Sequence, residues 1–428
     1  MSDPIQSFSP AFDAQTVADI LRENMEKNGG ELALSGSGKY PKTELRIAAA
    51  SLEARRKISG RLKEWFSCPQ LVYPNSLCLE QCSSEITARY KGKILQDFLQ
   101  THLQENDFTG ADLTGGLGID TYYMSQHFRS YDYFERNPDL CTSAVWNFRA
   151  LEADRISVHQ AETSLGSIEK LIAEGRHYTS VFLDPARRDA KSSRVFGISD
   201  CEPDVLQLKE ALFMLADVIM LKLSPMIDIS DSLSKLENIC SVHVISVRNE
   251  CKEMIFLLKK GASVPAEEVP ITATMIDAQD RICEYTFTLG QESQASAPLA
   301  TDMDLAGQYL YEPDKAILKT GAFKKIAADF HLLKMDRNIH LYLSGNAPSS
   351  ETAFPGKVYH IDEVFGMDKK SIRQIKTQFS SAEIITKNIP LSGDQLRKKI
   401  GIKDGPATHL FGLGLPTGHF ILATSKFF

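Results

Sequence analysis

The sequence predicts an α/β protein built on a doubly wound, mostly parallel sheet. Between about residues 108 and 260, short apolar runs alternate with amphipathic stretches, a pattern typical of parallel strands joined by right-handed helical connections. A Gly-rich turn follows the first run, and acidic residues follow several others, so polar groups are expected at one edge of the sheet. The seven predicted strands are TGADLTGG, RSYDYFER, DRISVHQAE, YTSVFLDPA, ADVIMLKLSP, SVHVISVR and KEMIFLLKK.

The rest of the chain divides into three further regions. Residues 1–105 read as helical, with the glycines at 29–30 expected to stop the first helix and a serine expected to cap the last. The sheet domain is then expected to span 106–262, followed by a small β hairpin and linker at 263–304. Residues 305–428 predict a second, smaller α/β domain. A chain of 428 residues accommodates such a division.

Composition indicates a cytoplasmic protein. The N-terminus lacks the basic and apolar regions of a signal peptide, and no apolar run is long enough to span a membrane. The eight scattered cysteines are therefore expected to be reduced. Cys78 and Cys82 lie one helical turn apart without a second Cys or His pair, so we expect buried thiols and no metal site.

The Gly-rich turn, ADLTGGLGID, predicts a ligand site. Asp112 ends the first strand, and Gly115, Gly116 and Gly118 form the turn before a helix that begins near Ile119. Glycines allow positive φ and close approach of the backbone to a ligand. The adjacent glycines depart from the G-x-G-x-x-G fingerprint of dinucleotide sites, and the G-x-x-x-x-G-K of nucleoside triphosphate sites is missing from the sequence.

Acidic residues at successive strand ends suit an adenosine ligand that carries positive charge. Glu135 ends the second strand and can accept hydrogen bonds from both ribose hydroxyls. Ala161 and Glu162 follow the third strand, where an adenine edge would be read. Together with Asp112, these carboxylates disfavour a pyrophosphate and favour a cationic sulfonium.

These motifs resemble the class I S-adenosylmethionine-dependent methyltransferases over roughly residues 85–260. The whole chain is similar to a bacterial group of methyltransferases with a C-terminal THUMP-like domain, a likeness carried by LRKKIGIKDG and HLFGLGLPTGHFILATSK. The resemblance implies a Rossmann-like seven-stranded sheet and S-adenosyl-L-methionine as cofactor. It also implies that the cofactor contacts Asp112, Thr114, Gly115, Gly116, Gly118, Glu135, Arg136, Ala161, Glu162 and Asp184.

The D-P-A-R motif after the fourth strand resembles the D-P-P-Y motif of amino-group methyltransferases. That likeness implies that Asp184 and Pro185 orient an acceptor amine, a step that needs positioning more than acid–base chemistry. Two residues depart from this motif. Ala186 replaces its second proline, and Arg187 replaces the aromatic residue that would stack on a flipped base. Arg187 is expected to contact substrate through its guanidinium plane. Alternatively, Arg187 and Arg188 pair with Asp189 or Asp200 in a surface loop.

A second chemistry is compatible with the sequence. Asp184, Lys222 and Glu253, with Lys93 upstream, resemble the Lys-Asp-Lys-Glu tetrad of ribose 2′-O-methyltransferases, in which a lysine helps to remove a hydroxyl proton. The simpler interpretation makes Lys222 a salt-bridge partner of Asp184.

Two further segments carry candidate residues. Thr87, Arg89, Tyr90 and Lys91 precede the first strand and could reach the cofactor or substrate, or could form a solvated helix face with i,i+4 pairs. Asn147 matches a pattern found in RNA methyltransferases but could equally make local hydrogen bonds.

The C-terminal region is more basic than the rest of the chain. Residues 305–428 contain 17 Lys and Arg against 11 Asp and Glu, whereas the whole chain has a net charge of −7. Arg397, Lys398 and Lys399 form the densest cluster, and a THUMP-like unit implies binding to structured RNA, either tRNA or rRNA, through phosphates. The sequence thus predicts an RNA methyltransferase with a base nitrogen as favoured target. A small-molecule or protein methyltransferase and a non-catalytic RNA-binding protein remain alternatives.

Overall fold

The computed structural model describes residues 8–103, 107–187, 197–300, 304–348, 353–406 and 408–427. The chain forms two compact units, one made of Met1–Val242 and Glu253–Val264 and the other of His243–Lys252 and Pro265–Phe428. The finer four-part division of the sequence stays a prediction. Among the described residues, none of the helices is long and apolar enough to cross a bilayer.

The first unit begins with a series of helices. In order they are α1 (Ala14–Glu23), α2 (Gly29–Ser35), α3 (Lys42–Ile58), α4 (Lys63–Ser67), α5 (Ser76–Gln81) and α6 (Glu85–His102). The expectation that Gly29 and Gly30 stop the first helix was wrong, because they begin α2. Asn28 caps α2, and its side chain and that of Glu31 each bond the other residue's backbone N–H. Ser84 caps α6, as predicted.

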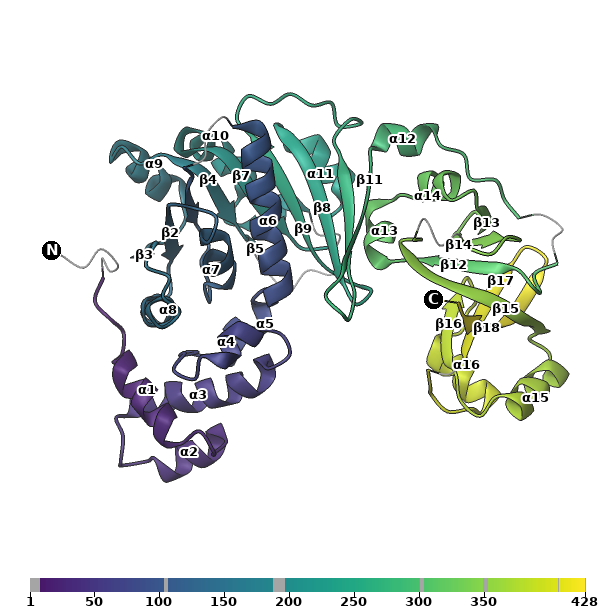
Figure 1. Ribbon diagram of the computed structural model, residues 1–428, viewed down its shortest axis with the longest axis horizontal. Coiled ribbons are helices and arrows are strands. Elements are labelled where there is room, and N and C mark those ends of the chain that lie inside the picture. Colours follow the sequence, from purple (N-terminus) through teal and green to yellow (C-terminus); the bar gives the residue numbers. More distant parts are fainter. Residues whose placement is uncertain are drawn as a thin grey trace. The chain divides into compact units, whose positions relative to one another are not determined.

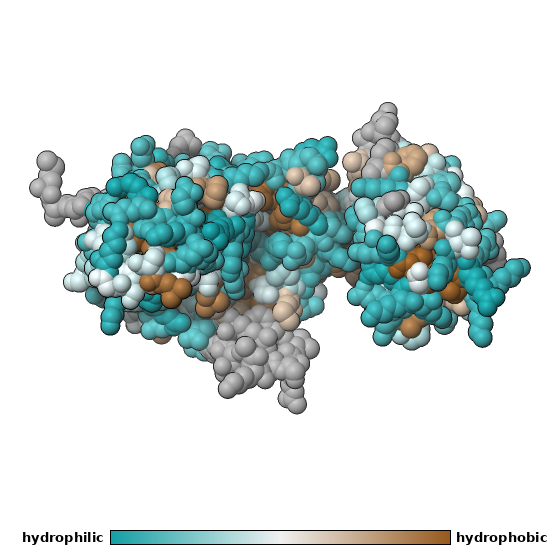
Figure 2. Space-filling model, turned by 90° about the horizontal axis from the view of Figure 1, so that it is seen from below, coloured by the Kyte–Doolittle hydropathy of each residue, from teal (hydrophilic) through white to brown (hydrophobic). Residues whose placement is uncertain are grey.

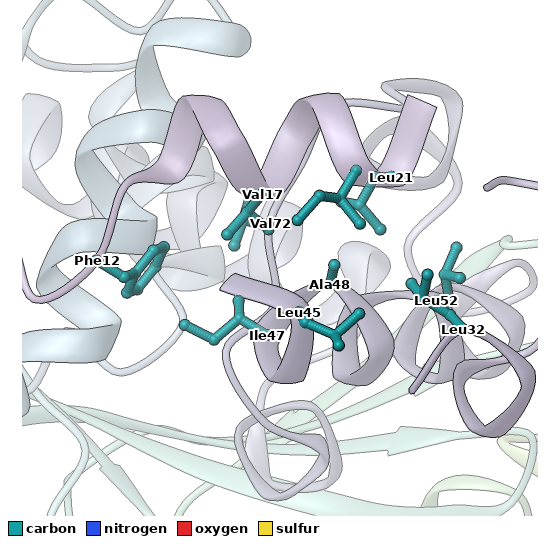
Figure 3. Close-up of a cluster of buried hydrophobic side chains, with 10 residues drawn as sticks. Phe12, Val17, Leu21, Leu32, Leu45, Ile47, Ala48, Leu52 and Val72 are labelled. Atoms are coloured by element: carbon teal, nitrogen blue, oxygen red, sulfur yellow. The ribbon is translucent and has the colours of Figure 1, made fainter. Parts of the chain in front are cut away.

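The first helices pack through a small core of their own. Val17 and Leu21 lie one turn apart on α1, and Ile47, Ala48 and Leu52 form the facing stripe of α3 (Figure 3). All five side chains are buried. The 3.6-residue period seen in the sequence therefore selects the faces that meet.

The sheet of the first unit confirms the predicted doubly wound fold. Its strands are β1 (Thr109–Asp112), β2 (Ser130–Glu135), β3 (Ile156–Gln160), β4 (Tyr178–Leu183), β7 (Ala216–Leu223), β8 (Ile239–Val247) and β9 (Glu250–Lys259). Within a nine-stranded sheet they lie in the order β3-β2-β1-β4-β7-β9-β8, and Figure 1 labels all of them except β1. β3, β2, β1, β4 and β7 pair in parallel, and β9 runs antiparallel to β7. Residues 243–252 at the tip of the β8–β9 hairpin belong to the second unit.

The strand order reverses between β1 and β4, which places the expected ligand crevice at their carboxyl ends. The strands are connected through α7 (Ile119–Ser125), α8 (Pro138–Ala150), α9 (Leu165–Ala173), α10 (Val205–Leu215) and α11 (Ile229–Lys235). Just beyond β4, the two-residue strand β5 (Ala186–Arg187) pairs with β6 (Cys201–Glu202). The D-P-A-R motif is thus partly held by backbone hydrogen bonds.

The second unit contains a hairpin, β10 (Ile271–Ile276) with β11 (Ile282–Phe287), as predicted, and a seven-stranded sheet. The strands of that sheet are β12 (Tyr309–Pro313), β13 (Leu333–Asp336), β14 (Ile339–Ser344), β15 (Gly356–Gly366), β16 (Glu383–Lys387), β17 (His409–Leu415) and β18 (Gly418–Lys426). Its helices are α12 (Leu289–Gln294), α13 (Lys315–Thr320), α14 (Lys324–Asp329), α15 (Lys369–Gln378) and α16 (Gly393–Ile400).

The two faces of this second sheet bury different residues. Alternate residues of β17 point to opposite sides: Phe411 joins one hydrophobic cluster, and Leu410 joins another that contains Ile375 of α15 and Leu396 of α16. The sheet is therefore a packed layer with helices on one side. In the view of Figure 2, hydrophilic residues dominate the visible surface of each unit.

The helical N-terminal region is attached to α8 by backbone-directed hydrogen bonds. Asn147 is fully buried, and its side chain both accepts from Val72 N at 2.8 Å and donates to Val72 O at 2.9 Å. The neighbouring Trp146 donates from Nε1 to Gln70 O at 2.8 Å. The structure thus favours the local hydrogen-bonding role for Asn147, because both of its amide groups are used on one residue.

We expect Asn147→Ala to lower the free energy of unfolding by about 2–4 kcal/mol, because it leaves a buried N–H and a buried C=O without partners. Trp146→Phe is the matched control, since it removes one half-exposed hydrogen bond from the same helix to the same loop and should cost about 1 kcal/mol. Urea unfolding measures both. Equal losses would show that Asn147 does not anchor the loop.

Candidate active site

The Gly-rich turn between β1 and α7 lies close to aromatic rings on one side and is open on the other. A Cβ on Gly115 would lie 2.2 Å from the ring of Tyr133, and one on Gly118 would lie 2.6 Å from Phe148. Gly116 has a φ of 55°, and a Cβ there would meet its nearest neighbour only at 3.8 Å. The turn therefore needs glycine for packing below and leaves an accessible backbone above, as a cradle for a ligand requires.

Asp112 shapes this turn from beneath. Its carboxylate accepts hydrogen bonds from Thr114 N at 2.9 Å and Thr121 Oγ1 at 2.6 Å, and the residue is 1% exposed. Burial raises the pKa of Asp112 to about 7, against the opposing effect of these hydrogen bonds. Thr114 Oγ1 in turn accepts from Asp184 N at 2.7 Å. Asp112 thus connects the end of β1 to the end of β4.

Glu135 lies at the end of β2, next to the turn. One of its oxygens accepts from Gly116 N at 3.0 Å and the other from Asn137 N at 2.8 Å. A carboxylate offers about four acceptor positions, so Glu135 keeps capacity for the two hydroxyls of a ribose. Two features at this edge fit an adenosine-containing ligand. The Gly-rich turn has an accessible backbone, and the Glu135 carboxylate still has acceptor positions for further hydrogen bonds.

The predicted adenine side is more exposed. Ala161 N donates to Glu135 O at 3.0 Å, which fixes the start of the loop after β3. Arg136 and Glu162 form an ion pair of 3.1 Å in which both side chains are about two-thirds exposed. This pair joins the ends of β2 and β3 at the surface.

Asp184 and Pro185 follow β4 directly, at the same edge of the sheet as Asp112. The Asp184 carboxylate is 38% exposed and accepts from Lys222 Nζ at 2.6 Å. Pro185 is buried, which fixes the chain where the acid projects. Arg187 lies in β5, and its side chain is outside the described part of the structure, as are Arg188 and Asp189.

Lys222, at the end of β7, is therefore the salt-bridge partner of Asp184 that the simpler interpretation predicted. Burial alone would lower the pKa of Lys222, but the carboxylates of Asp184, Asp120 and Glu253 outweigh it and hold that pKa well above its usual value. Lys222 is a stably charged ammonium group and a poor general base.

The upstream lysine of this site is Lys91, and the assignment of Lys93 to that position was wrong. Lys93 is exposed on α6, whereas Lys91 is fully buried and lies 2.5 Å from Glu253 Oε1 and 3.1 Å from Asp120 Oδ1. Lys91 therefore does not belong to a solvated helix face. The i,i+4 pairing expected for such a face is made by Arg89, which contacts Glu85 at 3.2 Å.

Asp120 and Ser83 complete the cluster and were not predicted from the sequence. Asp120 lies in the first turn of α7, two residues beyond Gly118, and Ser83 precedes α6. The sequence does carry a signal for Lys91, because it shares the apolar stripe of α6 with Ala88 and Leu95. Ser83 has no such signal, since its partners are separated from it by 8 to 139 residues.

The C-terminal basic cluster lies in the second unit and is only partly available to a ligand. Arg397 forms ion pairs with Asp394 and Asp404. Lys398 and Lys399 are exposed in the last turn of α16. Lys398 and Lys399 therefore remain candidates for phosphate contacts, whereas Arg397 is paired with acidic residues of the same unit.

A pH-dependent stability follows from the raised pKa of Asp112. Between about pH 4 and pH 7 the folded state keeps a proton that the unfolded state releases, so wild-type stability falls as pH rises. Relative to Asp112→Asn, we expect the free energy of unfolding of the wild type to fall by up to about 1.4 kcal/mol per pH unit over this range. Urea unfolding at several pH values measures the difference. A difference that is constant with pH would show that Asp112 is ionised throughout.

Comparisons with known proteins agree with this geometry. A model of a ferredoxin-like domain matches residues 309–350, and a model of a THUMP domain-like unit matches residues 356–426. An uncharacterized S-adenosylmethionine-dependent methyltransferase of Mycobacterium tuberculosis is 24% identical over 226 residues, which are 52% of this chain and 56% of that protein. The chain thus spans little more than half the length of the curated relatives it matches.

One solved structure is similar over nearly the whole chain. It is the crystal structure of a Porphyromonas gingivalis W83 protein assigned as a methyltransferase, and it is 30% identical with a TM-score of 0.84. The match covers 97% of this chain and 100% of that one. The protein therefore belongs to the class I methyltransferases with a C-terminal THUMP-like domain, a family whose cofactor is S-adenosyl-L-methionine.

Proposed function

We propose that this protein transfers the methyl group of S-adenosylmethionine to a base nitrogen in structured RNA. The observation that carries the proposal is Asp184, a carboxylate beside the Gly-rich turn that is held by Lys222 yet is 38% exposed. An exposed acceptor next to a cofactor cradle can orient an amine by accepting its hydrogen bond. The bound cofactor supplies the electrophilic methyl group.

The residues around the cradle have distinct roles in this proposal. Asp112 and Thr114 set the shape of the turn, and the backbone of Gly115, Gly116 and Gly118 approaches the methionine part. Glu135 accepts the ribose hydroxyls with the capacity left after its two backbone hydrogen bonds. Arg136, Ala161 and Glu162 border the adenine.

The charge state of Lys222 favours an amine over a ribose hydroxyl. A hydroxyl must lose its proton to become a good nucleophile, and a lysine with a raised pKa does not accept one near neutral pH. An exocyclic amine needs an acceptor that turns its nitrogen toward the methyl group, and after transfer the methylated nitrogen releases its extra proton to water. Asp184 meets that need without a change in its own charge.

RNA is favoured as substrate class by the THUMP-like match in the second unit, where Lys398 and Lys399 are exposed. Ammonium groups contact phosphates without reading bases, which suits binding to folded RNA by shape. Arg397 stabilises the end of α16 through its two acidic partners.

The proposal is tested with tritiated cofactor and separate pools of tRNA, rRNA, protein and metabolites. We expect label in an RNA pool and, after nucleoside digestion, on a base. Label confined to protein or metabolites would contradict the RNA assignment, and label on ribose would contradict the role given to Asp184. Cofactor binding without any transfer would indicate a non-catalytic RNA-binding protein.

In the labelled pool, Asp184→Ala should lower the rate on the order of 100-fold, because the acceptor nitrogen loses the side chain that accepts its hydrogen bond. Asp217→Ala is the matched control, since Asp217 lies at the end of β7 opposite to Lys222. Calorimetry should give a similar affinity for the demethylated cofactor in all three proteins. A rate within about threefold of wild type for Asp184→Ala would remove Asp184 from the mechanism.

RNA affinity gives an independent prediction. Lys398→Ala with Lys399→Ala should reduce the slope of log affinity against log salt by about 2, because two phosphates would no longer be bound by an ammonium group. Lys325→Ala is the control, because Lys325 already forms an ion pair with Asp329 in the same unit. Fluorescence anisotropy at several salt concentrations measures the slopes. Equal slopes for the double variant and wild type would place the RNA contact elsewhere.

A further inference from the structure

The two lysines beneath the candidate active site share one hydroxyl group. Ser83 Oγ lies 2.9 Å from Lys91 Nζ and 3.3 Å from Lys222 Nζ, and it donates to Asp120 Oδ2 at 2.8 Å. A hydroxyl has two acceptor positions and one proton, so Ser83 has none left for another partner. Ser83 therefore holds both ammonium groups beside the same carboxylate.

Two buried carboxylates bridge the same pair of lysines. Asp120 lies 3.1 Å from Lys91 and 3.6 Å from Lys222, and Glu253 lies 2.5 Å from Lys91 and 3.9 Å from Lys222. The two lysines and the two carboxylates carry no net charge. In both pairs the shorter distance is to Lys91, so Lys91 is the main partner of the buried acids.

Lys222 has a different closest partner, Asp184, at 2.6 Å. Lys222 can make this contact because Lys91 already neutralises the buried acids. Without Lys91, one ammonium group would serve three carboxylates, and two of them are 11% exposed or less. Buried charges attract a counterion more strongly than an exposed one does, because water screens them less. Lys222 would then be drawn away from Asp184.

We infer that Lys91 and Ser83, supplied by the helical N-terminal region, are positioning residues of the active site that leave Lys222 free to hold Asp184. Neither residue needs to touch the substrate. The helical region therefore contributes residues that set the geometry of the active site, and α6 does more than pack against the sheet. This inference rests on the proposed role of Asp184.

The position of Asp184 can be measured without knowing the substrate. Sinefungin is a cofactor analogue with an amine in place of the transferable methyl group, and S-adenosylhomocysteine lacks both. A correctly placed Asp184 should favour the amine through a charge-assisted hydrogen bond. The ratio of the two dissociation constants, measured by calorimetry, therefore reports the orientation of Asp184.

We expect Lys91→Met to reduce the preference for sinefungin about tenfold, which corresponds to the loss of one charge-assisted hydrogen bond. The double variant Lys91→Met with Glu253→Gln removes one charge of each sign and should keep the wild-type preference. Lys93→Met, on the exposed face of the same helix, is the control and should not change it. Thermal unfolding checks that each variant is folded.

The outcomes separate the inference from the proposed function. If Asp184→Asn leaves the preference unchanged, Asp184 does not face the methyl donor and both ideas fail. If Asp184→Asn removes the preference but folded Lys91→Met retains it, the inference alone is overturned. If Lys91→Met does not fold, the charge-balanced double variant provides the test. Loss of the preference for sinefungin in that double variant would overturn the inference.

Discussion

Two buried ammonium groups, on Lys91 and Lys222, constrain the whole first unit. Removing such ions from water costs several kcal/mol each unless close opposite charges and hydrogen bonds replace the lost hydration. The replacing groups come from separate elements: Asp120 from α7, Glu253 from β9 and Ser83 from the segment before α6. The helical region, the Gly-rich turn and the far side of the sheet are therefore held together at one point.

The glycine turn depends on a second constraint, the aromatic residues below it. Tyr133 fills the space in which a side chain at position 115 would lie, and its hydroxyl donates to Gly116 O at 2.5 Å. The ring of Phe148 fills the space in which a side chain at position 118 would lie. The glycines of the turn and the aromatic residues beneath it therefore depend on each other, because larger residues in the turn would clash with the rings. The backbone of the turn is thereby fixed in place before any ligand binds, which reduces the ordering cost of binding.

Local patterns were enough to predict the sheet and the edge at which the candidate site lies. Apolar runs and glycines located the turn and the seven strands β1–β4 and β7–β9, because those signals depend on neighbouring residues, whereas the two-residue strands β5 and β6 were missed. Asp112, Glu135 and Asp184 were chosen as candidates because parallel strands present their carboxyl ends at one edge. Strands β12 and β13 of the second unit were missed, since YLYEP and LKMD are short and contain charged residues.

The partners of Lys222 could only partly be predicted, because they depend on distant packing. Asp184 is its neighbour by strand order, and that pair was an expected alternative. Choosing Lys91 over Lys93 required the rotation of α6 about its axis. A two-residue shift moves a side chain by about 200° around a helix, from the buried face to solvent. The sequence motif alone does not determine that rotation.

The buried charges are better explained by orientation than by stability. Replacing a buried ion network with apolar residues of similar volume is often neutral or stabilising, so stability alone gives little reason to keep one. The charged groups of this network are buried, with the exception of one carboxylate. Lys91, Asp120 and Glu253 are 9% exposed or less, whereas the Asp184 side chain is 38% exposed. Such an arrangement holds one acid at the open edge of the sheet with its other neighbours already neutralised, which is what an acceptor-orienting carboxylate requires.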